Sequence, residues 1–478
     1  MTSFDHLELH AHRTPGRAAL VVGESTFSYG RFHADAMRFT CALASCGVTR
    51  GQIVLVSHAH PYVHWLLLVA CENLGAVSVS SPDTDALGDS PAVPAADHVF
   101  AEGAAPSGAR RARAWQIDGP WLRRAFDRPI AECRSHPRVA LPPDAPMRIA
   151  HSSGTTGRQK AMVLRRSAQE EKLRLLCAAS GETRDSRILV SMPFSVNSAW
   201  LQASLSLRLG ACVVVAPLMQ ALGDHGVTDT EVLPLVLDAM LREIPPAFVK
   251  PARFSITVIG APLPARLRER ALGVLCTDIT CRYGSNEVWP IALGMSDGAG
   301  TLCPGVEARI VDAAGDEAAP GHAGHIAVRS ATMVDGYFAD PEATGRHFRD
   351  GWFLTGDMGR LPRPGVIELL GRADDVLNYG GLKRSPVPLE TALRAIPGVR
   401  DVAVTSFASG HAIDTLGIAA VLDGRVHQDD LSPAIRLATA EWPHVLVAPI
   451  AALPVTAMGK LDRAELRRRL MAEVRFAA

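Results

Sequence analysis

The ten residues from His151 to Lys160 concentrate groups that could bind phosphate. Their sequence is His-Ser-Ser-Gly-Thr-Thr-Gly-Arg-Gln-Lys. Glycines permit the positive φ angles that turn successive backbone N–H groups toward an anion, hydroxyls add donors, and a lysine adds a mobile positive charge. Residues 147–150 before the segment predict a short strand, and residues 161–164 after it are apolar again. The segment therefore predicts a loop around an oligophosphate; the alternative is an ordinary turn of this composition.

The segment departs from the phosphate loop of P-loop NTPases. Lys160 has the right offset from Gly154, but Gln159 stands where the second glycine is required and Ala161 replaces the Mg²⁺-binding hydroxyl. It resembles instead the glycine-rich loop of the adenylate-forming superfamily, Ser-Gly-Thr-Thr-Gly-x-Pro-Lys-Gly. This superfamily includes acyl-CoA synthetases, peptide-synthetase adenylation domains and luciferases. The resemblance implies that ATP is bound by Ser152, Ser153, Gly154, Thr155, Thr156, Gly157 and Lys160. It further implies that Thr156 binds a Mg²⁺ ion.

A second motif, Arg-Tyr-Gly-Ser-Asn-Glu at residues 282–287, resembles the family's Tyr-Gly-x-Thr-Glu. An aromatic ring can stack on adenine, and a carboxylate can hold Mg²⁺ against phosphates. The resemblance gives these roles to Tyr283 and Glu287 and places Gly284 at the nucleotide. Asn286 replaces the usual threonine and can still hydrogen-bond a phosphate oxygen. Outside this context, the string is typical of a plain turn.

A third motif, Gly-Trp-Phe-Leu-Thr-Gly-Asp at residues 351–357, is similar to the family's Trp-x-x-Thr-Gly-Asp. A carboxylate can accept hydrogen bonds from both hydroxyls of a ribose. The resemblance therefore implies that Asp357 binds the ribose of ATP. The alternative is a plain strand-to-turn transition.

A fourth motif, Gly-Arg-Ala-Asp-Asp at residues 371–375, resembles the family's Gly-Arg-x-Asp-Asp. The planar fork of Arg372 suits ribose or phosphate oxygens. The resemblance places a hinge at Asp374, where a large φ/ψ change is absorbed. It also implies that Gly380 and Gly381 form a loop facing a thiol nucleophile. A solvated turn is the alternative.

A fifth motif, residues 454–463, resembles the family's Pro-x-Thr-x-x-Gly-Lys-x-x-Arg. Gly459 permits a tight turn that projects Lys460. An ammonium between the incoming carboxylate and the α-phosphate would stabilise the charge that builds up in the transition state. The resemblance gives the catalytic roles to Lys460 and Glu287. The alternative for Lys460 is a surface lysine after a turn.

The acid pocket is the least specific prediction. In amino-acid-activating members of the family, an aspartate follows a phenylalanine equivalent to Phe194 and pairs with the substrate ammonium. Ser195 cannot form that ion pair, which argues against a standard α-amino acid. A Gly-Ala-Pro-Leu turn beginning at Gly260 resembles the family's turn beside the acyl group and adenine. The predicted pocket, which suits an aliphatic or aromatic acid alike, consists of Phe194, Ser195, Asn197, Trp200 and Gly260.

The bulk composition sets further limits. The 478 residues are too many for one compact core and predict at least two domains. A formal net charge of zero offers no bulk attraction to nucleic acid or anionic lipid. Nine scattered cysteines with no Cys-x-x-Cys pair favour a reducing, cytoplasmic location, and we expect no signal peptide, membrane span or metal site at the clustered histidines.

Alternating helix and strand patterns predict an α/β fold with a parallel sheet flanked by helices. Expected helices cover residues 4–13, 32–46, 62–74, 168–178, 238–243, 266–272 and 464–474. Expected strands cover residues 18–22, 53–57, 76–80, 147–150, 187–192, 212–216 and 255–259. Residues 81–114 predict a loop or weak structure. We expect a large N-terminal core of mixed or parallel sheets, residues 1–371, and a small mobile α+β C-terminal lid, residues 372–478.

Five motifs in the family's order cover nearly the whole chain. They imply an ATP- and Mg²⁺-dependent enzyme that converts a carboxylic acid to an acyl-adenylate and pyrophosphate. Transfer to a thiol would follow, on CoA or on the phosphopantetheine of a carrier protein. The alternatives are a stand-alone adenylation enzyme that loads a carrier protein or uses a non-thiol nucleophile, and a nucleotide-binding homologue without catalysis.

Overall fold

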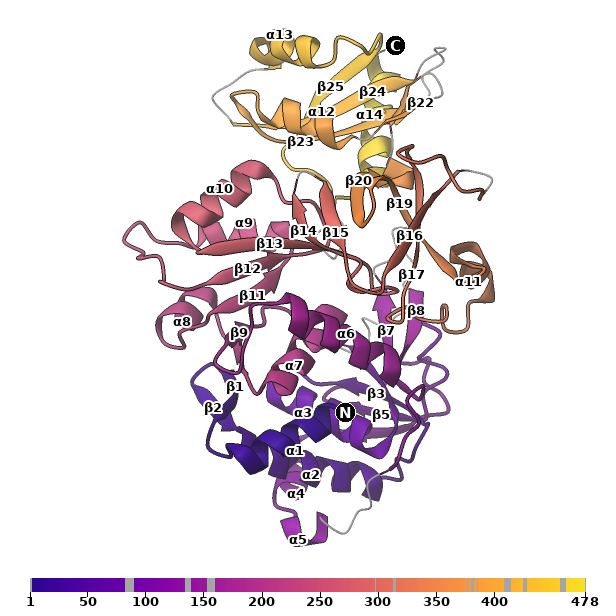
Figure 1. Ribbon diagram of the computed structural model, residues 1–478. Coiled ribbons are helices and arrows are strands. Elements are labelled where there is room, and N and C mark those ends of the chain that lie inside the picture. The colour runs from indigo at the N-terminus through magenta and orange to yellow at the C-terminus, as the bar shows by residue number, and fades with distance from the viewer. Residues whose placement is uncertain are drawn as a thin grey trace. The chain divides into compact units, whose positions relative to one another are not determined.

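The computed structural model describes residues 2–81, 90–133, 139–152, 160–296, 298–312, 315–375, 377–379, 382–384, 386–407, 414–423, 428–455 and 461–477. The chain forms two compact units (Figure 1). The first consists of Met1–Met295, Cys303–Glu307 and Arg329–Phe353, and the second of Ser296–Leu302, Ala308–Val328 and Leu354–Ala478. The domain boundary predicted at residue 371 and the hinge at Asp374 stay predictions.

A six-stranded sheet in the first unit carries the phosphate-loop segment. Its strand order is β6-β5-β3-β4-β7-β8, and the strands are parallel except for β8, which runs antiparallel to β7. The bounds are β3 (Ile53–Ser57), β4 (Val77–Ser81), β5 (His98–Ala101), β6 (Arg113–Gln116), β7 (Pro146–Ser152) and β8 (Lys160–Arg165). The helix α3 (Pro61–Leu74) packs on β3 and β4.

The prediction that residues 81–114 form a loop or weak structure is wrong for β5 and the start of β6. All four residues of β5 are buried, and β5 pairs with β3 on one side and β6 on the other. Each strand is only four residues long and lies among Ala, Pro, Gly and Asp, so the local pattern shows no period. Burial and pairing with neighbouring strands form these elements against the local composition.

A second sheet of the first unit places the nucleotide motif. Its strands follow the order β2-β1-β10-β9-β11-β12-β13-β14, parallel from β1 to β13 and antiparallel at both ends. The bounds are β1 (Ala18–Val22), β2 (Ser25–Ser28), β9 (Arg187–Leu189), β10 (Cys212–Val215), β11 (Asp229–Val232), β12 (Ser255–Val258), β13 (Asp278–Tyr283) and β14 (Ala292–Ser296). β13 ends at Tyr283, so the motif lies in the turn that leads into β14.

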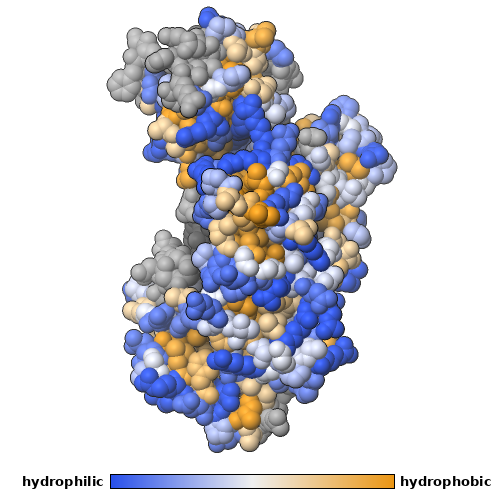
Figure 2. Space-filling model, turned by 90° about the vertical axis from the view of Figure 1, so that its left-hand side faces the viewer, coloured by the Kyte–Doolittle hydropathy of each residue, from blue (hydrophilic) through white to orange (hydrophobic). Residues whose placement is uncertain are grey.

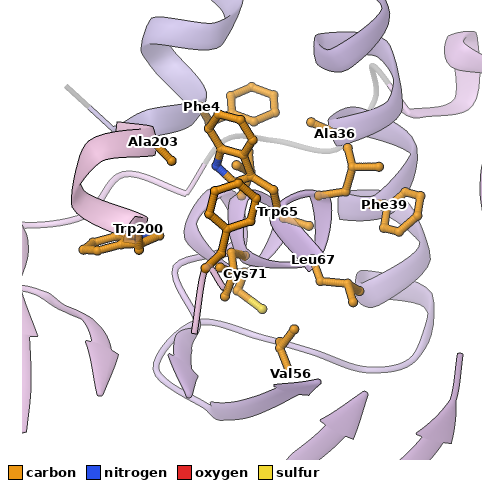
Figure 3. Close-up of a cluster of buried hydrophobic side chains, with 14 of the residues drawn as sticks. Phe4, Ala36, Phe39, Val56, Trp65, Leu67, Cys71, Trp200 and Ala203 are labelled. Carbon is orange, nitrogen blue, oxygen red and sulfur yellow. The ribbon is translucent and has the colours of Figure 1, made fainter. Parts of the chain in front are cut away.

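The main core of the first unit lies among helices α1 (Ser3–Arg13), α2 (Tyr29–Ser45), α3 and α7 (Asn197–Leu209). Figure 3 shows Trp65 at its centre, with Trp200 and Ala203 contributed by α7. The remaining helices are α4 (Gly119–Phe126), α5 (Ile130–Cys133), α6 (Arg166–Ala179), α8 (Leu218–Gly223), α9 (Pro234–Arg242), α10 (Ala265–Val274) and α11 (Pro341–His347). The helix predicted at 238–243 begins earlier, at Pro234, because proline is favoured in the first turn of a helix.

The second unit contains neighbouring strands in the order β16-β17-β19-β20-β15, a separate three-stranded sheet in the order β23-β24-β25, and a hairpin. The bounds are β15 (Ala299–Leu302), β16 (Glu307–Val311), β17 (Gly324–Arg329), β19 (Trp352–Arg363), β20 (Val366–Arg372), β23 (Val399–Phe407), β24 (Thr415–Leu422) and β25 (Val445–Pro449). The hairpin joins β21 (Leu377–Tyr379) to β22 (Leu382–Arg384), and the helices are α12 (Val387–Arg394), α13 (Gln428–Ala438) and α14 (Arg463–Ala477).

The α/β class predicted from the alternating pattern is confirmed.

Hydrophilic side chains cover much of the face in Figure 2, with hydrophobic residues gathered in smaller patches. Isolated exposed apolar residues are ordinary on protein surfaces. Across the described parts of the chain, every helix is too short or too polar to cross a bilayer.

Candidate functional site

The phosphate-loop segment connects β7 to β8. Ser152 at the end of β7 lies opposite Lys160 at the start of β8, so the two ends of the segment are fixed by strand pairing. The side chain of Ser152 and residues 153–159 lie outside the described residues. The predictions for Ser152, Ser153, Gly154, Thr155, Thr156 and Gly157 therefore stay predictions.

Lys160 is positioned by two aromatic side chains from the segment around α11. Its Nζ lies 2.9 Å from Nε2 of His347 and 4.7 Å from the centroid of the Tyr337 ring. A lysine ammonium only donates hydrogen bonds, so Nε2 of His347 accepts. The face of Tyr337 adds a cation–π contact. These contacts fix the ammonium at the edge of the segment predicted to hold phosphates.

Tyr337 also binds the predicted metal ligand. Its O–H donates to Oε1 of Glu287 at 2.9 Å, and Glu287 is only 7% exposed. One carboxylate in such a setting fits Mg²⁺, which takes few protein ligands and keeps phosphate and water oxygens. Within the parts of the chain that the structure describes, His, Cys, Asp and Glu form no cluster of three that could hold a metal. His6, His58 and His64 are buried, and the absence of a metal site at the clustered histidines stays a prediction.

Lys172 of α6 is a buried neighbour of Glu287. Its Nζ donates to the backbone oxygen of Asn286 at 3.5 Å, and its side chain is 1% exposed. Burial lowers the pKa of Lys172 to about 8, and the negative charge of Glu287 partly opposes this shift. The positive charge of Lys172 is thus close enough to interact with the Glu287 carboxylate, which is predicted to bind Mg²⁺.

Asn286 connects the nucleotide motif to two other predicted sites. Its Nδ2 donates to the backbone oxygen of His151, and its Oδ1 accepts from Nδ2 of Asn197, both at 3.1 Å. Position 284, two residues before Asn286, requires glycine, because a Cβ there would lie 2.6 Å from the Trp289 ring. The structure therefore brings Asn286 and Asn197 together at the start of the phosphate-loop segment.

The other predicted pocket residues lie around α7. Phe194 packs on Trp65 with ring centroids 5.1 Å apart, and Trp200 is buried in the same core. Gly260 directly follows Ile259, which packs with Leu173 of α6 and Leu201 of α7. The backbone at Gly260 has a φ of +81°, which favours glycine. Asn197 differs from the rest, since it bonds Asn286.

In the second unit, the predicted ribose residues meet across two strands. Asp357 of β19 lies opposite Arg372 of β20, and Nη1 of Arg372 donates to Oδ1 of Asp357 and to the Thr355 oxygen, both at 3.1 Å. Gly356 has a φ of +77°, and a Cβ there would lie 2.8 Å from Arg372. Asp357 can still accept further hydrogen bonds, because a carboxylate has about four lone-pair sites.

The flanks of the predicted Lys460 turn are fixed. Val455 forms a bridge with Leu461, and Arg463 binds Asp375 at 3.3 Å and Glu390 at 2.8 Å. Asp374 lies in the short 3₁₀ turn Ala373–Asp375, directly before Asp375. Lys460, Gly380 and Gly381 lie outside the described residues, and their predicted roles stay predictions.

Four side chains at this site were missed by the sequence argument: Arg148, Lys172, Tyr337 and His347. A pattern points to the first, because Arg148 interrupts the apolar run Met-Arg-Ile-Ala of a predicted buried strand. Lys172 falls on the buried face of α6, where charge is rare. Tyr337 and His347 reach Lys160 from a segment far along the chain, which no local pattern reveals.

Comparison with known proteins identifies the family. The family of AMP-binding enzymes matches residues 7–338, and the chain belongs to it. It is 28% identical to an indoleacetate–CoA ligase of Aromatoleum aromaticum (strain DSM 19018 / LMG 30748 / EbN1) over 506 aligned residues, covering 96% of both chains. It is 30% identical to a 3-hydroxybenzoate–CoA ligase of Aromatoleum sp. (strain CIB) over 363 residues, covering 70% of this chain and 69% of the other.

A solved structure shares the fold over nearly the full length. ATP-bound MatB from Rhodopseudomonas palustris superposes with a TM-score of 0.86 over 98% of this chain and 99% of that chain, at 22% identity. At this identity the likeness establishes the fold. The predicted superfamily is confirmed by the family match and by the named relatives.

Proposed function

We propose that this enzyme activates a carboxylic acid as an acyl-adenylate and then transfers the acyl group to the thiol of CoA. An oxygen of the acid attacks the α-phosphorus of ATP, and the bond to the β-phosphate oxygen breaks to release pyrophosphate. The thiol sulfur then attacks the acyl carbon, AMP leaves with the bridging oxygen, and the thiol proton is released. Membership of the AMP-binding family and likeness to named CoA ligases support this sequence of steps.

The observation that carries the proposal is the polar cluster around Tyr337. It connects Lys160, next to the phosphate-loop segment, with Glu287 of the nucleotide motif. Lys160 would hold β- and γ-phosphate oxygens, because a fixed ammonium pairs well with phosphate. Asn286, which precedes Glu287 in the motif, would donate to phosphate, and Tyr283 would stack on adenine.

Glu287, and Thr156 by its motif, would hold Mg²⁺, which supplies neutralisation of the triphosphate charge when bound. In the second unit, Asp357 would accept hydrogen bonds from the ribose hydroxyls, with Arg372 holding its carboxylate in place. Lys460 would stabilise negative charge at the reacting carboxylate, and Gly380 and Gly381 would face the thiol. Asp374 is the proposed hinge about which the C-terminal lid would rotate between adenylation and transfer to the thiol.

The test measures pyrophosphate release and nucleotide products over a panel of aliphatic, aryl and amino acids. Hydroxylamine, CoA and a phosphopantetheine carrier protein serve as separate acceptors. We expect acid-dependent formation of AMP and pyrophosphate, hydroxamate in the presence of hydroxylamine, and thioester with CoA. Formation of ADP, or a complete lack of acid dependence across the panel, would overturn the proposal. Loading of the carrier protein without CoA turnover would show that the acceptor is the carrier protein and not CoA.

A further inference from the structure

Arg148 is a fully buried cation in the middle of β7. Its side chain is only 1% exposed. Nη2 donates to the backbone oxygens of Phe194 at 3.0 Å and Ser195 at 3.3 Å, and the guanidinium lies 4.7 Å from the Trp200 ring. Arg148 therefore contacts three of the residues predicted to form the acid pocket.

The remaining donors of this guanidinium, Nε and Nη1, have no hydrogen-bond acceptor among the described residues. Among the residues that the structure describes, no carboxylate lies within ion-pair distance of Arg148. A buried donor without an acceptor costs about 1–3 kcal/mol, and more when it is charged. The Arg282–Glu231 pair of the same unit shows the usual arrangement, in which a buried arginine meets a carboxylate at 3.3 Å.

The other titratable neighbours of Arg148 do not supply the missing negative charge. Burial lowers the pKa of both His64 and His151 to about 4, and the positive charge of Arg148 adds to each shift. His64 bonds the His58 backbone oxygen and Ser80, and His151 bonds Ser90. Burial also lowers the pKa of Arg148 to about 9, which leaves the guanidinium protonated at neutral pH.

We propose that Arg148 determines the specificity of the acid pocket, and that the preferred acid carries a second anionic group that pairs with its guanidinium. A dicarboxylic acid is the simplest such substrate. The inference rests on the proposed function, in which the first carboxylate reacts at ATP and only a second anion remains for Arg148. The same buried charge disfavours acids that carry an ammonium group. Because protein atoms cover Nε and Nη1, the second anion must displace them as it binds.

The experiment compares matched acids of equal skeleton. Hexanoate is paired with adipate, and phenylacetate with 4-carboxyphenylacetate, and kcat/KM of acid-dependent ATP–pyrophosphate exchange is measured for each. We expect the wild-type enzyme to prefer the diacid in at least one pair. Arg148→Met should lower kcat/KM for that diacid by about 10- to 100-fold more than it lowers kcat/KM for the matched monoacid. Arg148→Lys should retain part of the preference, since it keeps the charge but not the fork.

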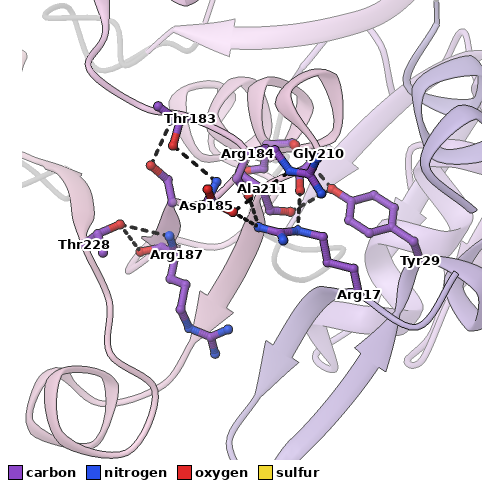
Figure 4. Close-up of polar contacts among 11 residues, drawn as sticks. Arg17, Tyr29, Thr183, Arg184, Asp185, Arg187, Gly210, Ala211 and Thr228 are labelled. Carbon is purple, nitrogen blue, oxygen red and sulfur yellow. Dashed lines mark hydrogen bonds and ion pairs between the residues drawn. The ribbon is translucent and has the colours of Figure 1, made fainter. Parts of the chain in front are cut away.

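Arg17→Met is the matched control. Arg17 likewise donates to two backbone oxygens, those of Gly210 and Arg184, and it also pairs with Asp185 at 3.0 Å (Figure 4). None of these partners belongs to the predicted pocket. Loss of Arg17 should lower stability without changing the ratio of diacid to monoacid turnover. Equal loss of both acids in Arg148→Met, or a preference for the monoacid in every wild-type pair, would overturn the inference.

A binding measurement separates this inference from the proposed function. The melting temperature is recorded with each acid in the absence of ATP. If no acid supports exchange but the diacid stabilises the wild-type protein and not Arg148→Met, the inference holds and the proposed function fails. If exchange occurs but no diacid is preferred or stabilising, the proposed function holds and the inference fails.

Discussion

At the scale of single residues, Tyr337 is the side chain on which the proposed nucleotide site depends most. Its ring lies against Lys160 and its hydroxyl binds Glu287, so one residue contacts both the proposed phosphate ligand and the proposed metal ligand. The motifs predicted Lys160 and Glu287 from their own neighbours in sequence. The residue that joins them lies about fifty positions beyond Glu287, and only the fold brings it there.

Tyr337→Phe should weaken the use of Mg²⁺ and ATP without removing the lysine contact. The change deletes the donor to Glu287 and keeps the ring beneath Lys160. We expect a several-fold to 10-fold loss in kcat/KM for MgATP and a higher Mg²⁺ requirement, from the loss of one charge-assisted hydrogen bond. Steady-state exchange rates at varied Mg²⁺ measure both effects.

Tyr29→Phe provides the control for this experiment, because Tyr29 donates to the Ala211 backbone oxygen at 2.7 Å outside the site. It should lower stability and leave the Mg²⁺ requirement unchanged. An unchanged requirement in Tyr337→Phe as well would show that Glu287 does not depend on Tyr337.

At the scale of elements, helix α1 contains a histidine that should make the folded state sensitive to acid. His6 is buried, and in the part of the chain that the structure describes neither of its ring nitrogens has a hydrogen-bond partner. Burial, followed by the positive charge of Arg208, lowers its pKa to about 4 from an ordinary value near 6.5. The unfolded chain therefore binds a proton more readily than the folded one. The stability contributed by neutral His6 is present above pH 6.5 and is lost as the pH falls from 6.5 toward 4.

His6→Leu should remove part of this acid sensitivity. Leucine has a similar volume and no proton to bind, so the variant should be more stable than the wild type at pH 5 by about 1–2 kcal/mol. Denaturant unfolding at pH 7 and at pH 5 gives the difference in the free energy of unfolding between His6→Leu and the wild type at each pH. His12→Leu, at an exposed site on the same helix, is the control for a histidine-to-leucine substitution. Parallel pH profiles for wild type and His6→Leu would contradict the prediction.

The accuracy of the predicted elements depended on whether local pattern or tertiary pairing forms them. Helices with clear caps, such as α1 and α3, were predicted within a residue or two. β5 was missed because its four residues become a strand only through pairing with β3 and β6. The register of β7 and β8, which sets Lys160 opposite Ser152, also needed the structure.

At the scale of the whole molecule, the proposed groups are distributed over both compact units. Lys160, Glu287 and Asn286 belong to the first, and Asp357, Arg372 and Lys460 belong to the second. The motifs predicted these groups, but the domain boundary predicted at residue 371 assigned Asp357 to the large N-terminal core, and that boundary stays a prediction. The motifs did not predict buried groups such as Arg148, because the resemblance covers only the residues that members of the family share. The identity of the carboxylic acid substrate must instead be inferred from residues that are particular to this chain.

The central claim is that one chain performs adenylation and thiol capture with different groups, and Lys460→Ala tests it most directly. Acid-dependent ATP–pyrophosphate exchange measures the first step, and transfer from supplied acyl-AMP to CoA measures the second. We predict that exchange falls by at least about 100-fold, because an oriented charge at the transition state is lost, while transfer from acyl-AMP stays within a few-fold of wild type. Normal exchange in Lys460→Ala, or equal loss of both steps, would contradict the account.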